Sequence, residues 1–463
     1  MSKYNFFKKI LRDNYKGEII EGDKKYKIFN EVKKLNFLCT KKRNLVLIFC
    51  HNEMQSIISY LWALANNNIA ILVNSNLDYN LAENLIKKYS PDIIITKYSN
   101  KFKNYNVEVE INKFFYLKKI SSGKNKFFKD LALLLPTSGS TGSPKFVRIS
   151  YKNLYYNTKD IVNYLHIKPF DITITTLPFS YTYGMSIINS HIFVPSKIIA
   201  YNGTVIERRF FELIKKWKVN SFGGVPLIFE MLKRLKLENF DLSSLKYITQ
   251  AGGPLSKQLI KFFHNSFKKK KIKFITMYGS TEATSRMSYL PEKFNQTKTT
   301  SIGKGLQKSF KINDLNTGKE INENNKLGEL VYFGKNVCLG YSLNSKDLSL
   351  KDQNKGILKT GDIGYKDEDG FFYVTGRLDR YVKIYDQRMN MDDIEKILLL
   401  KFSNICVKYK NKKIFIFSEK DHNGNKILEF LSSKIKIHKN IINYIKIPKL
   451  PRNPNGKINY AKL

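Results

Sequence analysis

Cysteine is scarce in this chain, and its spacing does not suit a metal site. The four cysteines stand at positions 39, 50, 338 and 406 of 463 residues and form no Cys-x-x-Cys pair. Cys50 and His51 are adjacent, which is poor geometry for joint ligation of one ion. We therefore interpret the cysteines as buried, reduced thiols of a cytosolic protein.

Long apolar runs are also missing. The most apolar region, residues 44–74, is interrupted by His51, Glu53 and three consecutive asparagines, so no run reaches the ~20 residues that cross a bilayer. The first residues have lysines around a short apolar patch and lack a signal-peptide core. The sequence predicts a cytoplasmic protein without membrane insertion.

Acidic residues are few: 39 Asp and Glu face 80 Lys and Arg, which gives a formal net charge of +41. Such a charge suits a nucleic acid, an anionic membrane or an acidic carrier protein as partner. The alternative is a bias of composition, because Lys, Asn, Ile, Tyr and Phe, the residues of AT-rich codons, are abundant together. We favour the second interpretation, since the lysines are spread along the chain, and expect no nucleic-acid partner.

The length and the pattern of apolar residues predict an α/β fold with more than one lobe. Short β-rich runs at 44–49, 69–74 and 92–96 alternate with helical patterns at 54–67 and 79–89, and the alternation returns at 209–282. This order is typical of a parallel sheet covered by helices. We expect a β-rich subdomain at about 297–376 and a small α+β domain after it, with a boundary near 376–380.

The stretch TSGSTGSPK, residues 137–145, resembles a phosphate-binding loop. Glycines let backbone N–H groups turn toward an anion, hydroxyls add donors and a lysine adds charge. It is not a Walker loop, because Pro144 precedes Lys145 and a strand-like run follows instead of a helix.

Four further motifs follow along the chain: MYGSTEAT at 277–284, TGD at 360–362, GRLDR at 376–380 and PRNPNGK at 451–457. Taken singly, each could be an ordinary polar turn. An acid after a glycine turn, such as Asp362, can also hold the two hydroxyls of a ribose.

In this order the five motifs are similar to those of the adenylate-forming superfamily, which includes acyl-CoA synthetases, peptide-synthetase adenylation domains, carrier-protein ligases and firefly luciferase. The resemblance implies a large domain at 1–376 with the phosphate loop at 137–145, a hinge at 377–380 and a small mobile domain at 381–463. It implies ATP and Mg²⁺ as cofactors, and a two-step reaction in which a carboxylate becomes an acyl-adenylate and then an acyl thioester.

The resemblance also implies roles for single residues. Thr281 contacts the α-phosphate, Glu282 and Thr137 hold Mg²⁺, and Lys457 bridges the attacking carboxylate and the α-phosphate. Gly252, Gly253 and Tyr278 flank the adenine, Asp362 and Arg377 bind the ribose, and Asp379 is the hinge. The catalytic residues are Lys145, Thr281, Glu282 and Lys457, and the whole nucleotide set is Thr137, Ser138, Gly139, Ser140, Thr141, Gly142, Lys145, Gly252, Gly253, Tyr278, Gly279, Ser280, Thr281, Glu282, Asp362, Arg377, Arg388 and Lys457.

Two departures bear on the second step and on the substrate. Where the family has K-x-x-G-x-R, Asp386 replaces the glycine that borders the pantetheine arm. The gate of the carboxylate site falls on Tyr181. The segment 177–191 contains no acid, which argues against an α-amino acid. The expected substrate pocket, Phe179, Tyr181, Tyr183, Phe222 and Gly224, favours an apolar or aromatic acyl group, although its rings could equally be core.

The predicted function is therefore an ATP-dependent carboxylate ligase that transfers its acyl group to CoA or to the phosphopantetheine of an acyl carrier protein. One alternative delivers the acyl group only to a carrier protein or an amine, without CoA. A second is a non-catalytic nucleotide-binding homologue.

Overall fold

The computed structural model describes residues 2–98, 102–120, 125–137, 145–237, 240–306, 309–384, 387–435, 439–452 and 458–463. Its contacts divide the chain into two compact units. The first unit comprises residues 1–309 and 333–358, and the second comprises 310–332 and 359–463. The predicted hinge at 377–380 concerns motion and stays a prediction.

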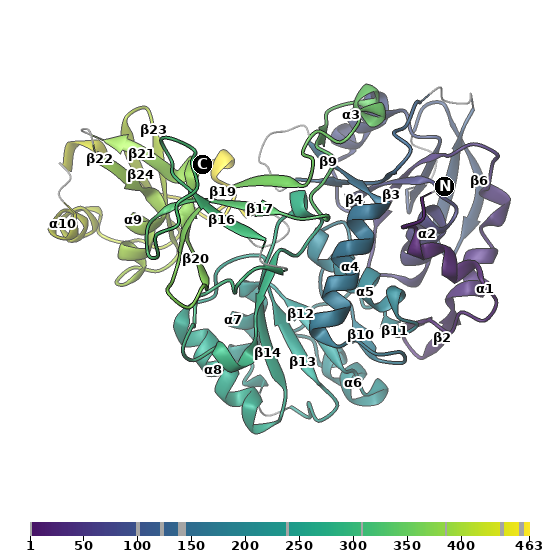
Figure 1. Ribbon diagram of the computed structural model, residues 1–463, viewed down its shortest axis with the longest axis horizontal. Helices are drawn as coiled ribbons and strands as arrows, with labels where there is room; N and C mark the ends of the chain where they lie inside the picture. Colours follow the sequence, from purple (N-terminus) through teal and green to yellow (C-terminus); the bar gives the residue numbers. More distant parts are fainter. Residues whose placement is uncertain are drawn as a thin grey trace. The chain divides into compact units, whose positions relative to one another are not determined.

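The first unit contains two mixed sheets (Figure 1). One has the order β15-β14-β13-β12-β10-β11-β1-β2 and the other the order β18-β9-β8-β4-β3-β5-β7-β6. The strands of the former are β1 (Glu18–Glu21), β2 (Lys24–Lys27), β10 (Ile172–Ile174), β11 (Lys197–Ile199), β12 (Ser221–Gly224), β13 (Tyr247–Gln250), β14 (Lys273–Tyr278) and β15 (Ser288–Leu290). Those of the latter are β3 (Leu45–Cys50), β4 (Ile69–Asn74), β5 (Ile93–Thr96), β6 (Tyr105–Ile111), β7 (Phe114–Lys119), β8 (Leu131–Pro136), β9 (Phe146–Ser150) and β18 (Tyr341–Ser342).

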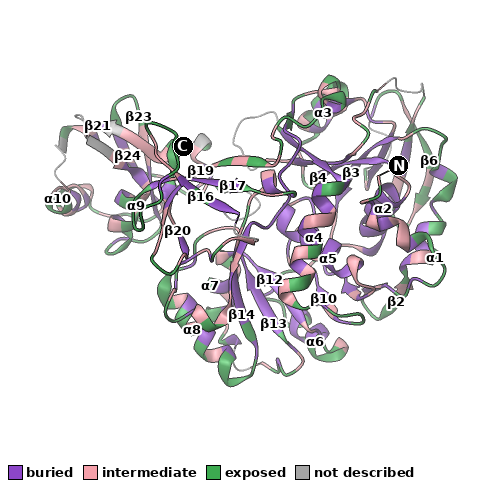
Figure 2. Cartoon of the chain, viewed as in Figure 1, coloured by how far each residue is buried: buried purple, intermediate pink, exposed green. Residues whose placement is uncertain are grey.

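Helices pack between the two sheets and on their outer faces. The helices of this unit are α1 (Ile28–Lys33), α2 (Met54–Ala65), α3 (Tyr79–Tyr89), α4 (Tyr151–Leu165), α5 (Thr182–Phe193), α6 (Arg208–Trp217), α7 (Pro226–Arg234) and α8 (Lys257–Lys269). One core cluster joins side chains of both sheets with those of α2, α4 and α5, and Figure 2 shows the central strands of the two sheets, such as β3, β4, β12 and β13, largely as buried. Every residue of α2 is buried, as expected for a helix that packs on all sides.

Over its described residues, the second unit contains smaller sheets and two α-helices. Its strands are β16 (Phe310–Asn313), β17 (Gly328–Phe333), β19 (Ile357–Lys366), β20 (Phe372–Arg377), β21 (Tyr381–Ile384), β22 (Gln387–Asn390), β23 (Ile405–Lys410), β24 (Lys413–Ser418) and β25 (Ile442–Lys446), and its helices are α9 (Met391–Leu399) and α10 (Gly424–Lys434). The strands β16-β17-β19-β20 form one sheet and β23-β24-β25 another, which packs against α9 and α10.

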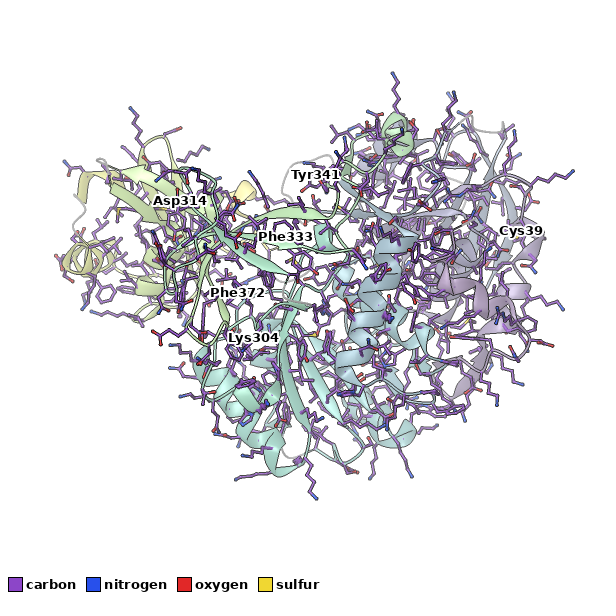
Figure 3. The ribbon with its side chains drawn as sticks, viewed as in Figure 1. Cys39, Lys304, Asp314, Phe333, Tyr341 and Phe372 are labelled. Atoms are coloured by element: carbon purple, nitrogen blue, oxygen red, sulfur yellow. The ribbon has the colours of Figure 1, made fainter. Side chains whose placement is uncertain are left out.

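The predicted α/β class is confirmed, with antiparallel strands added at the sheet edges. Within the described ranges, no helix combines the length and apolar content needed to cross a membrane. The prediction that all four cysteines are buried was wrong for Cys39. Cys50, Cys338 and Cys406 are buried, but Cys39, labelled in Figure 3, is exposed, because it follows a short helical turn (Asn36–Leu38) of which only Leu38 is buried.

Candidate active site

The phosphate loop connects two antiparallel strands of the first unit. Pro136 of β8 pairs with Phe146 of β9, and the Thr137 N–H donates to the carbonyl oxygen of Lys145 at 3.0 Å. The ladder therefore continues to both ends of the loop and holds them at strand spacing. The loop positions between them, predicted from Ser138 to Gly142, lie outside the described residues.

A tyrosine joins the end of this loop to the acid of the YGSTE motif. Tyr341 of β18 lies opposite Val147 of β9, and its ring centre is 3.4 Å from Nζ of Lys145. Its hydroxyl donates to Oε1 of Glu282 at 3.1 Å. One side chain, labelled in Figure 3, thus contacts both predicted catalytic charges. Sequence reasoning missed it, because Tyr341 stands outside every motif.

The YGSTE segment is a tight turn at the carboxyl end of β14. A Cβ atom on Gly279 would lie 1.6 Å from the carbonyl oxygen of Ser285, so the close approach requires glycine. The turn continues as a short 3-10 helix, Thr281–Ala283. The Asn336 side-chain amide donates to the carbonyl oxygens of Ala283 and Arg286, at 2.9 and 2.8 Å. These contacts fix the backbone that carries Thr281 and Glu282.

Ser280, in the same turn, has a hydroxyl enclosed by protein. Among the described residues it has no hydrogen-bond partner. An enclosed hydroxyl without a partner is costly, so the turn has a polar group to offer a ligand. Tyr278 and Thr281 are partly buried beside it.

The predicted adenine glycines follow β13. Gly252 has φ +90°, and a Cβ there would lie 2.8 Å from the hydroxyl oxygen of Tyr181. A Cβ on Gly253 would be 3.3 Å from the Pro226 ring. Burial raises the pKa of Tyr181, and the nearby charge of Arg286 offsets part of that rise. The Tyr181 hydroxyl therefore lies against the glycine turn and within reach of the charge of Arg286.

The predicted pocket residues fall in two places. Tyr183 and Phe222 line the same cavity, and a Cβ on Gly224 would press on Ile228 and Phe229 of α7. Phe179 is fully buried in the core between the sheets, with its ring 5.8 Å from that of Tyr60.

Arg286 is the cavity residue that sequence reasoning missed. It is 4% exposed, and its guanidinium lies 4.0 Å from the centre of the Tyr183 ring. The signal was an arginine four residues after the YGSTE acid, at the end of a buried turn.

In the second unit, Asp362 and Arg377 lie directly opposite each other on β19 and β20. Arg377 Nη1 donates to Oδ1 of Asp362 at 3.0 Å. Asp362 is 8% exposed, so the structure brings the two predicted ribose residues together as an ion pair. Asp379 is exposed and lies 3.7 Å from Nε of Arg377.

The remaining predicted residues cannot be placed. Lys457 and Asp386 lie outside the described residues, and so does the side chain of Arg388. Arg452 and Ile458, on either side of the NPNGK segment, form an antiparallel bridge.

The donors predicted for Mg²⁺ suit that ion. Glu282 offers a carboxylate and Thr137 a hydroxyl, both hard oxygen ligands, and Mg²⁺ is usually bound by one or two carboxylates together with substrate phosphates. Within the described ranges, no cluster of three or more His, Cys, Asp or Glu side chains forms a separate metal site.

Comparison with known proteins identifies related chains. The family described as AMP-binding enzyme matches residues 38–342. Luciferin 4-monooxygenase of Luciola mingrelica is 28% identical over 346 residues, and the probable 4-coumarate–CoA ligase 2 of Dictyostelium discoideum is 30% identical over 346 residues. Both alignments cover 71% of this chain, which spans 62% of the length of these relatives.

Two solved structures share the fold. The o-succinylbenzoate CoA synthetase of Bacillus subtilis, in complex with its acyl-adenylate intermediate, matches with a TM-score of 0.78 at 20% identity, over 99% of this chain and 97% of that one. The ATP-bound MatB of Rhodopseudomonas palustris matches with a TM-score of 0.75 at 18% identity, over 100% of this chain and 98% of that one.

Proposed function

This chain belongs to the AMP-binding enzyme family, and from that premise we propose that it activates a carboxylic acid with ATP. The carboxylate oxygen attacks the α-phosphorus, a new P–O bond forms, and the bond to the bridging oxygen of pyrophosphate breaks. The products are an acyl-adenylate and pyrophosphate. No general base is needed, because the attacking carboxylate is already ionised.

The contact between Lys145, Tyr341 and Glu282 is the observation that carries this proposal. In-line displacement at phosphorus depends on positioning and on neutralising charge. Lys145 is exposed at the end of the phosphate loop, where its ammonium can meet the β- and γ-phosphates. Glu282 and Thr137 would hold Mg²⁺, which neutralises charge on the phosphate oxygens when bound.

The roles of Lys457, Thr281, Asp362 and Arg377 follow from the same proposal. Lys457 would bridge two anions, the carboxylate and the α-phosphate, whose repulsion opposes attack. Asp362 would hold the ribose hydroxyls with Arg377 beside it, and Asp379 would be the hinge on which residues 381–463 turn.

We further propose that the acyl group then passes to a thiol, either of CoA or of a carrier-protein phosphopantetheine. The thiolate sulfur attacks the acyl carbon, a C–S bond forms and AMP leaves. Asp386, where the family has glycine, adds bulk and negative charge beside the predicted thiol path. Delivery to a carrier protein or an amine without CoA is the alternative.

Pyrophosphate release from a panel of carboxylic acids, with and without CoA, tests both steps. Release with at least one acid is expected. If no acid releases pyrophosphate, the proposed function is wrong. If release occurs but CoA never accelerates turnover, the acceptor is not CoA, and Asp386→Gly then tests whether the aspartate obstructs the thiol.

The Lys457→Ala variant tests the first step more closely. It is expected to bind ATP as the unaltered protein does and to lose pyrophosphate release. Lys449→Ala, which removes an exposed lysine of the same unit, is the matched control and is expected to keep full activity. Full release by Lys457→Ala would contradict the role given to Lys457.

A further inference from the structure

Arg286 is a buried cation without a counter-ion. Its Nη1 donates to the Ser285 hydroxyl at 2.7 Å, and its Nε contacts the sulfur of Met277 at 3.3 Å. Within the described residues, Arg286 forms no ion pair; it also contacts the Tyr183 ring and, through its charge and a hydrogen bond, offsets part of the rise that burial causes in the pKa of Tyr164. A guanidinium has five N–H donors and a thioether is a weak acceptor, so part of its hydrogen-bonding capacity is unused.

Arg148 shows how this fold satisfies a buried arginine that has only a structural role. Its guanidinium donates to five oxygen atoms, four of them backbone carbonyls of residues 339–351 and the fifth on the side chain of Gln353. Arg286 has no such set of carbonyls. The contrast indicates that the missing acceptors come from a ligand.

Two further polar groups face the same cavity without a partner. The Tyr247 hydroxyl and His191 Nε2 are fully enclosed and make no hydrogen bond to the described residues. The Ser221 hydroxyl is close enough to affect the pKa of Tyr247, yet it does not complete a hydrogen bond. Tyr247 and His191 are 6% and 2% exposed, so bulk water does not satisfy these groups.

The protonation state of His191 determines whether its Nε2 donates or accepts a hydrogen bond. Its Nδ1 lies 2.8 Å from the carbonyl oxygen of Ile187. A carbonyl only accepts, so Nδ1 carries the hydrogen. Burial lowers the pKa of His191 to about 4, and the ring is therefore neutral at pH 7. Its Nε2 then offers a lone pair to the cavity, beside the hydroxyl of Tyr247 and the charge of Arg286.

We propose that this cavity binds the distal end of the acyl substrate, and that Arg286 selects a short acid that carries a second carboxylate. Leaving a buried cation unpaired is strongly destabilising, and a carboxylate matches the planar fork of a guanidinium. The cavity, with its open mouth, has an empty volume of about 310 Å³, at the low end for a small-molecule site, which favours a short acid over a long acyl chain. This inference rests on the proposed function and deepens it.

Tyr181 gives the cavity its place relative to the nucleotide turn. Its hydroxyl lies against Gly252, and the charge of Arg286 reaches it. The second carboxylate would pair with Arg286, while the reacting carboxylate points past Tyr181 toward the predicted nucleotide.

The test compares acids of equal length that differ by one carboxylate: propanedioic with propanoic, butanedioic with butanoic, and pentanedioic with pentanoic acid. For the unaltered enzyme, kcat/KM for pyrophosphate release is expected to favour a diacid over its monoacid at least tenfold. A preference for the monoacid in every pair would overturn the inference and leave the proposed function standing. If no acid of a wider panel releases pyrophosphate, the proposed function itself is refuted.

Variants of the cavity sharpen the result. Arg286→Met is expected to reverse the preference, with a change in the diacid-to-monoacid ratio of at least tenfold, and Arg286→Lys, which keeps the charge, is expected to retain its direction. Phe222→Leu, a cavity change without charge, is the matched control and should alter both acids by a similar factor. A ratio unchanged in Arg286→Met would show that the arginine is structural. If that variant does not fold, the comparison of acids with the unaltered enzyme decides.

Discussion

Replacing Tyr341 with phenylalanine separates two contacts made by one side chain. The variant keeps the ring, and therefore the cation–π contact with Lys145, but removes the hydroxyl that donates to Glu282 at 3.1 Å. If Glu282 must be held in place to bind Mg²⁺ with the phosphates, the affinity for MgATP falls. Tyr341→Leu removes both contacts.

The magnitude follows from the exposure of the site. Tyr341 is 36% exposed, so the hydrogen bond belongs in the low range of about 0.5–1.5 kcal/mol. That predicts a rise of about two- to tenfold in the dissociation constant of MgATP for Tyr341→Phe. An exposed cation–π contact adds about 0.5–1 kcal/mol, so Tyr341→Leu is expected to weaken binding by a further two- to fivefold.

Isothermal titration with MgATP measures both effects without knowledge of the acid. The chain offers a matched control in Tyr79, which is 42% exposed and donates to Glu83 at 2.9 Å. Tyr79→Phe removes a similar hydrogen bond from α3 and is expected to leave the dissociation constant unchanged. If Tyr341→Phe binds MgATP within experimental error of the unaltered protein, the positioning role of the hydroxyl is refuted. A similar loss in Tyr79→Phe would mean that both changes act through stability.

Three further predictions concern the folding of the same unit. Gly279→Ala places a Cβ 1.6 Å from the Ser285 oxygen and is expected to cost about 1–3 kcal/mol in urea unfolding, with loss of pyrophosphate release. Gly370→Ala is strained by its φ of +78° but meets no atom within 4 Å, so it is expected to lose some stability and keep the release. Arg148→Met removes a donor shared by four backbone carbonyls, of which that of Leu339 still accepts from the Gln353 N–H. A loss of about 3–5 kcal/mol is therefore expected by the same measurement, and a loss below about 1 kcal/mol would contradict it. Burial lowers the pKa of His191 to about 4, below the ~6.5 of an unfolded chain, so between these pH values only the unfolded state takes up the proton. The free energy of unfolding is therefore expected to fall by up to ~3 kcal/mol as pH drops from about 6.5 to about 4. His191→Asn should flatten that dependence on pH.

Much of the fold could be predicted from the sequence, because short stretches of residues indicate many of its strands and helices. The runs that form β3 and β4 are wholly or almost wholly buried, and continuous apolar runs of that length predict central strands. By contrast, β10 and β11 have three residues each, too few for a period to be recognised. Helix α4 was missed because its tyrosines and asparagines have low helix propensity; the structure stabilises its start with a capping box at Ser150 and Asn153.

The site residues also divide into those that a local motif identifies and those that only the pairing of distant strands brings into place. Asp362 and Arg377 each stand in a contiguous motif, and an antiparallel pair places them opposite one another, so motif reading found both. Tyr341 reaches Glu282 only because β18 pairs with β9, which lies almost two hundred residues earlier. No periodicity or spacing in the sequence encodes that pairing, and the tyrosine could not be assigned before the register was known.

The polarity of the acyl pocket illustrates the limit most sharply. Four aromatic residues near the predicted pocket favoured an apolar or aromatic acyl group, yet the face of Tyr183 lies against the guanidinium of Arg286. An aromatic face attracts a cation as readily as it packs an apolar chain, so the presence of rings does not determine the polarity of the space between them. Here the cation has no acid to neutralise it among the described residues, and two other enclosed groups face the same space without partners. A ligand that satisfies Arg286 must bring acceptor oxygens, whereas the neutral His191 Nε2 needs a hydrogen-bond donor, and the rings then serve to orient the arginine that receives those oxygens.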